Sequence, residues 1–379
     1  RSGALFEESG GASTGVGGGG EGGEGSDTLI RWKSEGVENK FVGYNLHTTH
    51  AKVVKVEKWN RTEVGSDGSD GSSESRQEEG WVVLDPTPFY TVGGGQVSDE
   101  GSIEVVVGGE EKRIDVVDAV RVSDQCTAVK VRGEGVQHLI EGSSVRAMVK
   151  NEERSRTSAH HTATHLLHSA LREVLSTTED GTKTGIDAKQ AGSLVNPDGL
   201  RFDFFCPRPL TPAEMERVEA KVNDAVRAGV NVTTSHCSFE EAVEGGALAY
   251  FETKKYGEGD VVRVVNVEGG YSSELCGGTH VRDTTVLQPF TIVKECSSSA
   301  GVRRIEAKTG WAAVDYLRQR SEIMLELSKK LRVPESQLMS KVETLQSEVK
   351  KAKKLQKEMK KAESMKRMKE KQQQQQQPE

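Results

Sequence analysis

The chain has 379 residues, which is enough for two or three domains with buried cores. Hydrophobic residues make up 34% and aromatic residues 5% of it, so we expect part of the chain to lie outside any packed core. The net charge of −7 does not indicate nucleic acid, and the absence of a long apolar run excludes a membrane-spanning helix. Five widely spaced cysteines argue against a disulfide framework and favour a reducing compartment.

The N-terminal part changes composition once. Residues 1–28 are rich in Gly, Ser and Glu, and such a segment buries too little apolar surface to offset the entropy of ordering it, so we predict disorder. Residues 29–150 instead alternate short apolar runs with Gly, Asp and Ser clusters, which predicts a β-domain of barrel or sandwich type. The runs lie at 53–56, 81–85, 103–107 and 128–131. Residues 65–80 predict a solvated loop between two of these strands.

Residues 151–311 mix helices with strands, which predicts an α+β domain. A helix over 161–175 is indicated by apolar residues that share one face, namely Ala163, Leu167, Ala170, Leu171 and Val174. A second helix over 211–228 begins with a Thr-Pro pair, which is a capping residue followed by proline at the first helical position. Strands are predicted at 230–234, 261–267 and 290–296.

Residues 312–370 predict helix, with one break at Val333–Pro334. After the break, apolar residues alternate steps of four and three, as in a heptad: Leu338, Val342, Leu345, Val349 and Ala352. We favour a coiled coil or helical hairpin that forms a homodimer over a long solvated helix with one apolar stripe. The lysine-rich part at 350–371 is either a soluble face or a surface for a phosphate backbone. Residues 371–379 form a low-complexity tail.

Two pairs of metal-binding residue types lie far apart in the sequence. His161 and His165 are four residues apart, so on the predicted helix they share a face, one turn apart. Cys276 and His280 flank two glycines, which allow the backbone to fold tightly so that both side chains point the same way. Either pair alone is more often a surface or core feature. Together they offer three imidazoles and one thiolate, a set that suits tetrahedral zinc.

Two further histidines, His160 and His168, neighbour the first pair. Because tetrahedral zinc takes four ligands, we expect these two beside the ligands or at the surface.

Several separated segments, which occur in the family order, resemble the alanyl-tRNA synthetase family. HTATHLLHSAL, QAGSLV with LRFDF, SSELCGGTHV and GVRRIEAKTG resemble its editing domain, and FVGY and LDPTPFYTVGGGQVSDEG resemble the preceding β-barrel. The helices from about residue 312 resemble the start of its oligomerisation region. The resemblance covers most of residues 38–360. It implies an α+β editing domain with an N-terminal β-barrel and a C-terminal helical or coiled-coil segment.

The resemblance implies hydrolysis of tRNA(Ala) mischarged with serine or glycine, as part of a synthetase that attaches alanine to tRNA(Ala). The family's ligands for one Zn²⁺ per chain carry over to His161, His165, Cys276 and His280. The family's active-site glutamine carries over to Gln190, and we expect Gln190 and Cys276 to be the catalytic residues. No segment resembles the aminoacylation domain, so we expect ATP to be used only by such a domain outside this chain.

Contacts with tRNA are expected at two places. The family's GGQ element carries over to Gly94, Gly95 and Gln96. Arg303 and Arg304 follow a glycine and suit contacts with tRNA phosphates, and the alternative is an ion pair with Glu306 or Glu295.

Several alternatives stay open from the sequence. Since the chain begins without methionine, we expect a processed product or a fragment of a full synthetase, and a free-standing trans-editing deacylase is the next reading. Non-enzyme alternatives are a tRNA-binding protein that keeps the editing fold, or a structural zinc domain with an oligomerising helix. The editing domain of threonyl-tRNA synthetase is disfavoured, because the barrel and GVRRIEA segments match the alanyl pattern. We expect a cytoplasmic location, with mitochondrion or plastid as the alternative.

Overall fold

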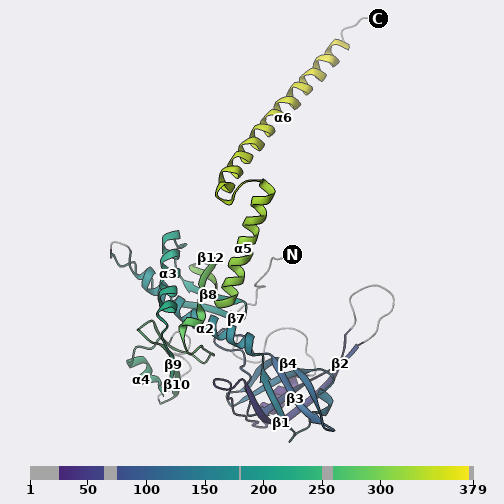
Figure 1. The fold of residues 1–379 in the computed structure, drawn as a ribbon, viewed down its shortest axis with the longest axis vertical. Coiled ribbons are helices and arrows are strands. Elements are labelled where there is room, and N and C mark those ends of the chain that lie inside the picture. The colour runs from purple at the N-terminus through teal and green to yellow at the C-terminus, as the bar shows by residue number, and fades with distance from the viewer. Residues whose placement is uncertain (1–24, 64–74, 179–180, 250–258, 375–379) are drawn as a thin grey trace. The chain divides into compact units, whose positions relative to one another are not determined.

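The computed structural model describes residues 25–63, 75–178, 181–249 and 259–374 (Figure 1). These residues divide into two compact units, with the boundary between Ala313 and Val314. The predicted disordered segment up to residue 24, most of the predicted loop at 65–80 and the last five residues of the tail lie outside the described residues. The rest of that loop, 75–80, is strand, and the first four residues of the tail, 371–374, are helix, which corrects both predictions there.

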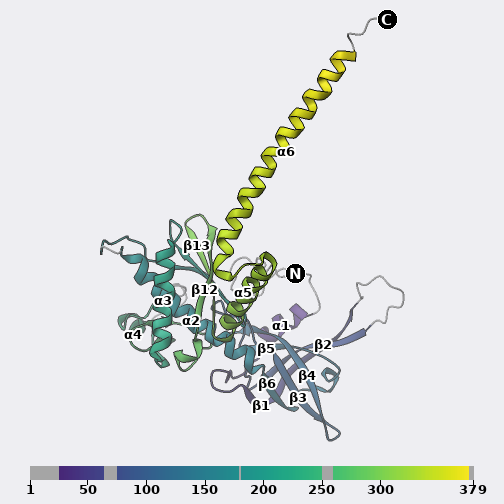
Figure 2. The same cartoon turned by 45° about the horizontal axis from the view of Figure 1, so that its top comes forward.

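Six antiparallel strands close into a barrel in the order β1-β2-β5-β4-β3-β6 (Figure 2). The strands are β1 (Thr48–Glu63), β2 (Ser75–Asp85), β3 (Gly101–Val107), β4 (Glu110–Ser123), β5 (Cys126–Arg132) and β6 (Ser144–Val149). Side chains alternate along each strand, so Val82 and Leu84 of β2 are buried in the barrel core while Trp81 and Val83 lie on its outer face. All four predicted apolar runs fall within these strands, and the barrel is the form that the β-domain takes.

Helix α1 (Gly25–Ser34) covers part of the outer face of the barrel. Its residues Leu29 and Trp32 are buried in one cluster with Trp81 and Val83. Because both faces of β2 are covered there, its sequence is continuously apolar instead of alternating. The structure therefore corrects the predicted N-terminal disorder at residues 25–28, where the burial of the helix offsets the entropy of ordering it.

The rest of the first unit packs helices against two antiparallel sheets. One sheet has the order β12-β13-β8-β7 and the other β11-β10-β9. The strands are β7 (Gln190–Asn196), β8 (Gly199–Phe205), β9 (Val232–Ser238), β10 (Val261–Val267), β11 (Ser272–Leu275), β12 (Phe290–Ser299) and β13 (Val302–Thr309), and the helices are α2 (Asn151–Ser176), α3 (Pro212–Ala228) and α4 (Phe239–Glu244). The predicted apolar face of α2 is buried with Phe202 and Phe204 of β8. This arrangement confirms the α+β class.

Helix α3 begins where the sequence predicts because its cap is complete. The Thr211 hydroxyl accepts a hydrogen bond from the backbone N–H of Glu214 (3.2 Å), and the Glu214 carboxylate accepts one from the N–H of Thr211 (2.8 Å). Pro212 occupies the first helical position, where a missing N–H costs nothing. Gly229 ends the helix in the left-handed conformation, with φ of 61°.

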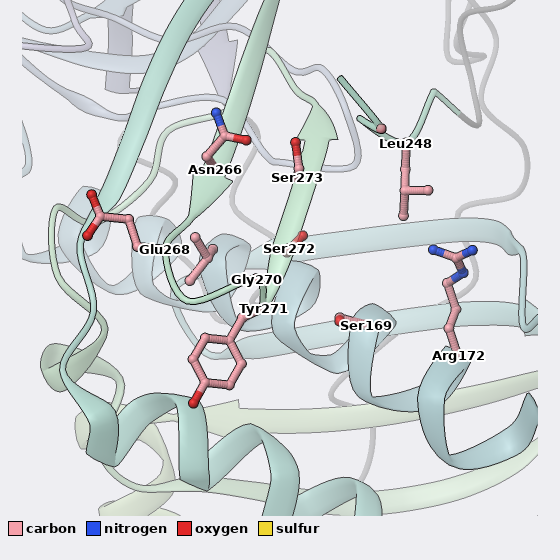
Figure 3. Close-up of a pocket in the computed structure, with 11 residues that line it drawn as sticks. Ser169, Arg172, Leu248, Asn266, Glu268, Gly270, Tyr271, Ser272 and Ser273 are labelled. Atoms are coloured by element: carbon pink, nitrogen blue, oxygen red, sulfur yellow. The ribbon is translucent and has the colours of Figure 1, made fainter. Parts of the chain in front are cut away.

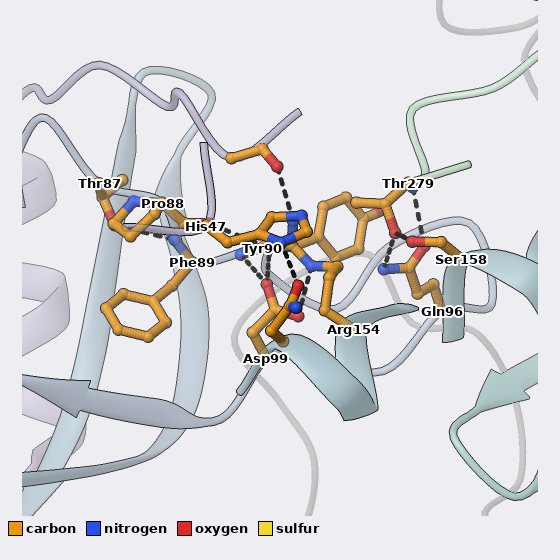
Figure 4. A network of polar contacts seen from close by, with 12 residues as sticks. His47, Thr87, Pro88, Phe89, Tyr90, Gln96, Asp99, Arg154, Ser158 and Thr279 are labelled. Carbon is orange, nitrogen blue, oxygen red and sulfur yellow. Dashed lines mark hydrogen bonds and ion pairs between the residues drawn. The ribbon is translucent and has the colours of Figure 1, made fainter. Parts of the chain in front are cut away.

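A buried cation joins the barrel to the α+β part (Figure 4). Arg154, in the first turns of α2, is 2% exposed and pairs with the carboxylate of Asp99, which precedes β3. The same guanidinium donates to the backbone carbonyls of Gly43 (2.6 Å) and Pro88 (3.0 Å). The charge is therefore fully partnered, as a buried ion must be, and it fixes the start of α2 against the barrel.

The second unit is helical. Helix α5 (Gly310–Leu331) crosses the boundary between the units, a short 3-10 turn follows at Glu335–Gln337, and α6 (Leu338–Gln374) continues to the end of the described residues. This confirms the predicted helices and their break. Several apolar side chains of α6 are exposed, among them Val342, Val349, Leu355 and Met359. Over the residues described, none of the helices is long and apolar enough to cross a membrane. Pairing of α6 in a homodimer stays a prediction.

Candidate metal centre

The four predicted ligand residues come together in the first unit. His161 and His165 project from α2, and Cys276 and His280 belong to the turn that follows β11. Their ligand atoms all lie within 4.8 Å of one another. The Cys276 Sγ lies 3.4 Å from Nε2 of His161 and 3.3 Å from Nε2 of His280. The sequence therefore predicted both the members of the cluster and their convergence.

These distances fit tetrahedral zinc. Bonds of about 2.3 Å to sulfur and 2.0–2.1 Å to nitrogen, at tetrahedral angles, place a sulfur and a nitrogen ligand about 3.5 Å apart. His161 and His165 are 3% and 5% exposed, while Cys276 and His280 are half-buried. The donor set of three imidazoles and one thiolate is the kind that binds zinc.

The charges inside the cluster lower the pKa of the Cys276 thiol, which favours the thiolate form that binds metals. Burial raises the pKa of the Cys276 thiol, but the neighbouring histidines lower it more, so that its pKa lies well below the usual value. Burial lowers the pKa of His280 to about 3. Burial also lowers the pKa of His165, but the carboxylate of Glu274 and Cys276 together raise it to about 9. These shifts favour the thiolate form of Cys276 and the neutral form of His280, and a metal that binds displaces the proton from His165.

In the turn that carries Cys276, Gly278 lies directly against the ring of His161. A Cβ atom on Gly278 would lie 2.0 Å from Cε1 of His161, so no larger residue fits there. A Cβ atom on Gly277 would meet nothing within 4 Å, which corrects the expectation that both glycines serve the tight turn. From β10, the Arg263 guanidinium donates to the carbonyls of Cys276 (2.7 Å) and Gly278 (2.9 Å) and holds the turn in place.

Each ligand histidine has a polar group beside its second ring nitrogen, Nδ1. The pairs are His161 with Gln96 Oε1 (2.7 Å), His280 with Thr162 Oγ1 (3.1 Å) and His165 with Glu274 Oε2 (3.8 Å). The first two are hydrogen-bond distances, and such partners orient metal-binding imidazoles and fix which nitrogen carries the proton. The third is an ion-pair contact that is too long for a hydrogen bond. Thr162 and Glu274 were not predicted from the sequence. The available signal was position, because Glu274 lies two residues before Cys276 along an extended segment and so shares its side.

His160 and His168 are both buried, at 0% and 1% exposure, so the surface alternative is wrong for both. Nδ1 of His168 lies 3.3 Å from Glu274 Oε1, which places this ring one residue away from the cluster. His160 instead links the helix to the sheet: its ring nitrogens contact the carbonyl of Asn196 (2.9 Å) and the N–H of Thr309 (3.2 Å). Burial lowers the pKa of His160 to about 4, so this link is made by a neutral ring.

The remaining predicted site residues lie on the sheet that packs against α2. Gln190 is the first residue of β7 and is half-buried. Arg303 forms an ion pair with Glu295 (2.5 Å), one of the two partners considered from the sequence. Arg304 pairs through two nitrogens with Asp203 (2.7 and 2.8 Å) instead of with either expected glutamate. Their contacts with tRNA stay predictions, as does the active-site role of Gln190.

The GGQ element lies between the barrel and the metal cluster. Gly94 and Gly95 both have positive φ, 60° and 82°, in the turn that leads to Gln96. Gln96 is 1% exposed, and its side chain contacts Thr279 (Figure 4). Its Oε1 also lies 2.7 Å from Nδ1 of His161. The tRNA contacts of these residues stay predictions. The buried Gln96 side chain makes its contacts inside the protein, with His161 and Thr279.

A separate hollow of about 430 Å³ lies between α2 and the β10–β11 hairpin (Figure 3). Its lining is mostly polar and includes Arg172 of α2 together with Asn266, Glu268 and Tyr271 of the hairpin. None of the four candidate ligands lines it. It is therefore distinct from the metal cluster.

Two protein families match parts of the chain. The family described as "Threonyl and Alanyl tRNA synthetase second additional domain" matches residues 262–306, which include the Cys276 turn. The family described as "tRNA synthetases class II (A)" matches residues 24–153, the segment that forms α1 and the barrel.

Curated relatives match most of the chain. It is 38% identical over 314 residues to the alanine–tRNA ligase of Thermoanaerobacter sp. (strain X514), covering 83% of this chain and 33% of the relative. For the alanine–tRNA ligase of Thermus thermophilus the identity is 41% over 334 residues, 86% of this chain and 35% of the relative. For the "Alanine–tRNA ligase, chloroplastic/mitochondrial" of Micromonas pusilla it is 43% over 271 residues, 71% of this chain and 28% of the relative. The chain spans about a third of the length of these relatives, and it belongs to the alanine–tRNA ligase family as a counterpart of that third.

Proposed function

We propose that this chain is the editing part of an alanine–tRNA ligase, which hydrolyses tRNA(Ala) mischarged with serine or glycine. The observation that carries the proposal is the cluster of His161, His165, Cys276 and His280, which fits one zinc ion. In this proposal, the ATP-dependent attachment of alanine to tRNA(Ala) is carried out by an aminoacylation domain, and no segment of this chain resembles that domain.

Hydrolysis of an aminoacyl ester requires a placed water, an acceptor for its proton and support for the developing oxyanion. His161, His165, Cys276 and His280 would hold the zinc, and with all four bound a tetrahedral ion would have to expand its coordination or release one ligand before it could position or polarise the substrate. The substrate approaches from the side of the half-buried Cys276 and His280, since His161 and His165 are enclosed by the protein. We assign to the Gln190 amide a hydrogen bond to the ester or to the serine hydroxyl.

Discrimination between serine and alanine follows from such a hydrogen bond. A site that is built to bind a substrate hydroxyl leaves its own polar group unpaired when the hydroxyl is absent, and rejection then reaches about 10⁴–10⁵-fold. In this proposal alanyl-tRNA(Ala) is spared because the methyl group of alanine cannot satisfy the polar group that receives serine. This hydrogen bond accounts for seryl-tRNA(Ala) alone, since glycine has no hydroxyl either.

The test is deacylation of seryl-tRNA(Ala) by the purified chain, with bound zinc assayed in parallel. We expect wild type to hydrolyse the ester and to bind one zinc, and Cys276→Ala to lose both. The matched control is Cys296→Ala, which removes a half-buried thiol of β12 outside the cluster and is expected to keep both. Wild type that binds zinc but leaves the ester intact would favour a non-catalytic tRNA-binding role. Wild type that binds no zinc would refute the proposed centre.

The remaining partners and the compartment are proposals as well. We propose tRNA(Ala) as the nucleic-acid partner and a homodimer through α6, supported by the apolar residues that this helix exposes. We propose a cytoplasmic location. The Micromonas relative, which is named for chloroplast and mitochondrion, keeps the organellar alternative open.

A further inference from the structure

We propose that the β-barrel completes the metal centre, with Gln96 acting as a positioning residue that sets the orientation and protonation of the His161 ring. This inference rests on the zinc site of the proposed function. It goes further, because it assigns a side chain of another fold element, 65 residues upstream of His161, to that site.

The hydrogen bonds of Gln96 determine which of its atoms accepts. Its side-chain oxygen Oε1 lies 2.9 Å from the backbone nitrogen of Thr279, and a backbone N–H can only donate. The Gln96 Nε2 lies 3.0 Å from the Thr279 hydroxyl, which can accept. The opposite orientation of the amide would face one donor with another. The atom 2.7 Å from Nδ1 of His161 is therefore the acceptor Oε1.

The protonation of His161 follows from this acceptor. Because Oε1 can only accept, Nδ1 of His161 carries the proton and donates it. In the neutral ring, the lone pair then lies on Nε2, the nitrogen that faces Cys276 Sγ at 3.4 Å. Gln96 thus presents His161 to a metal through the correct nitrogen. At 1% exposure of Gln96, water does not compete for this bond.

The backbone of the barrel turn is fixed on the sheet that borders the cluster. The N–H of Val195 in β7 donates to the carbonyl of Gly95 (2.7 Å), and the N–H of Val97 donates to the carbonyl of Val195 (3.1 Å). The segment thus extends the sheet by one short parallel pairing at its β7 edge. A Cβ atom on Gly95 would lie 2.1 Å from Ser193 Oγ, so the approach requires glycine. The backbone on either side of Gln96 is thus held by a hydrogen bond to Val195, one through Gly95 and one through Val97.

Tyr44, in the segment that leads into β1, also contacts the turn that carries Cys276. The hydroxyl of Tyr44 donates to the carbonyl of Gly277 (2.6 Å), and the guanidinium of Arg263 stacks 4.1 Å from the centre of the Tyr44 ring. Arg263 is the residue that holds the carbonyls of Cys276 and Gly278. Thr162 and Glu274, which face the other two ligand histidines, belong to the α+β part itself. The barrel therefore supports one ligand ring and one turn, and the α+β part supports the rest.

The test measures zinc affinity on the full chain, by competition with a chromophoric chelator. Gln96→Met keeps the volume but removes the acceptor, and we expect zinc affinity about 10–100-fold below wild type. Gln96→Glu keeps an acceptor for both His161 and Thr279, and we expect it to restore affinity to within about 3-fold of wild type. The matched control is Ser98→Ala, two residues away, whose hydroxyl donates to Asp118 inside the barrel part and touches no ligand.

Two results would overturn the inference while leaving the proposed function intact. One is wild-type affinity in Gln96→Met, which would make Gln96 an interface residue only. The other is an equal loss in Gln96→Met and Gln96→Glu. A third measurement needs no variant: ¹⁵N NMR of the zinc-loaded wild type should show His161 bound through Nε2 with its proton on Nδ1, and binding through Nδ1 would overturn the inference. Wild type that binds no zinc refutes the proposed function itself.

Discussion

Replacing Gly278 by alanine tests the metal centre through one methyl group. The added Cβ would lie 2.0 Å from Cε1, 2.3 Å from Nδ1 and 3.0 Å from Nε2 of His161. Carbon atoms in contact prefer about 3.5 Å, so the turn and the ring must separate by about 1.5 Å. Zinc bonds tolerate about 0.2 Å of error, and His161 therefore ceases to be a ligand.

The expected loss is larger than that for an outer partner of a ligand. Such partners cost about 10–100-fold in affinity, so loss of the ligand itself should cost at least about 100-fold, or about 2.8 kcal/mol. The control is Gly277→Ala, one residue away on the same turn, where a Cβ meets nothing within 4 Å. We expect this control to bind zinc as wild type does.

The assay is chelator competition for Zn²⁺ on both variants, with far-UV circular dichroism to confirm the fold. Equal zinc affinity of Gly278→Ala and Gly277→Ala would refute the reasoning, because only the first has a steric conflict with His161.

Two further predictions concern stability. The ion pair with Arg208 lowers the pKa of Glu214 to about 2 from 4.5, so its contribution is complete above pH 4.5 and is lost as the pH falls toward 2. Since Arg208 is partly exposed, we expect Glu214→Gln to lower the free energy of unfolding, measured with urea, by about 1–2 kcal/mol at pH 7 and by less at pH 3. The control is the exposed Glu216→Gln, which should stay within about 0.5 kcal/mol of wild type. A cost of Glu214→Gln that does not change with pH would contradict this. Free zinc at 100 times its Kd should stabilise wild type by about 2.7 kcal/mol, seen as a higher Tm that a chelator reverses, and an equal rise in Cys276→Ala would contradict binding in the cluster.

Residues with strong local patterns were predictable from sequence. The strand at 261–267 matches β10 residue for residue, and α3 begins directly after Thr211, because alternation and caps are local signals. The convergence of the four candidate ligands was predictable because two tight pairs of metal-binding residue types point to one shared site. The partners of the ligands were not, because Gln96 reaches His161 through a long-range contact that no local pattern encodes.

Helix α1 shows a different limit of sequence reasoning. Its first residues continue the Gly- and Ser-rich composition of the segment before it, and the outer face of the barrel is what Leu29 and Trp32 cover. Arg304 was ambiguous for a related reason, since its partner Asp203 is about a hundred residues away on the neighbouring strand β8.

The buried pair of Arg154 and Asp99 has a consequence for any attempt to divide this protein. A cut at residue 150, between β6 and α2, follows the change from strands to helices in the sequence. It would leave the Arg154 guanidinium, 2% exposed here, without a counter-ion or its carbonyl acceptors. Without the barrel this guanidinium faces water, and α2 loses the contacts that fix its first turns. A piece that is meant to keep the start of α2 in place should therefore include the barrel.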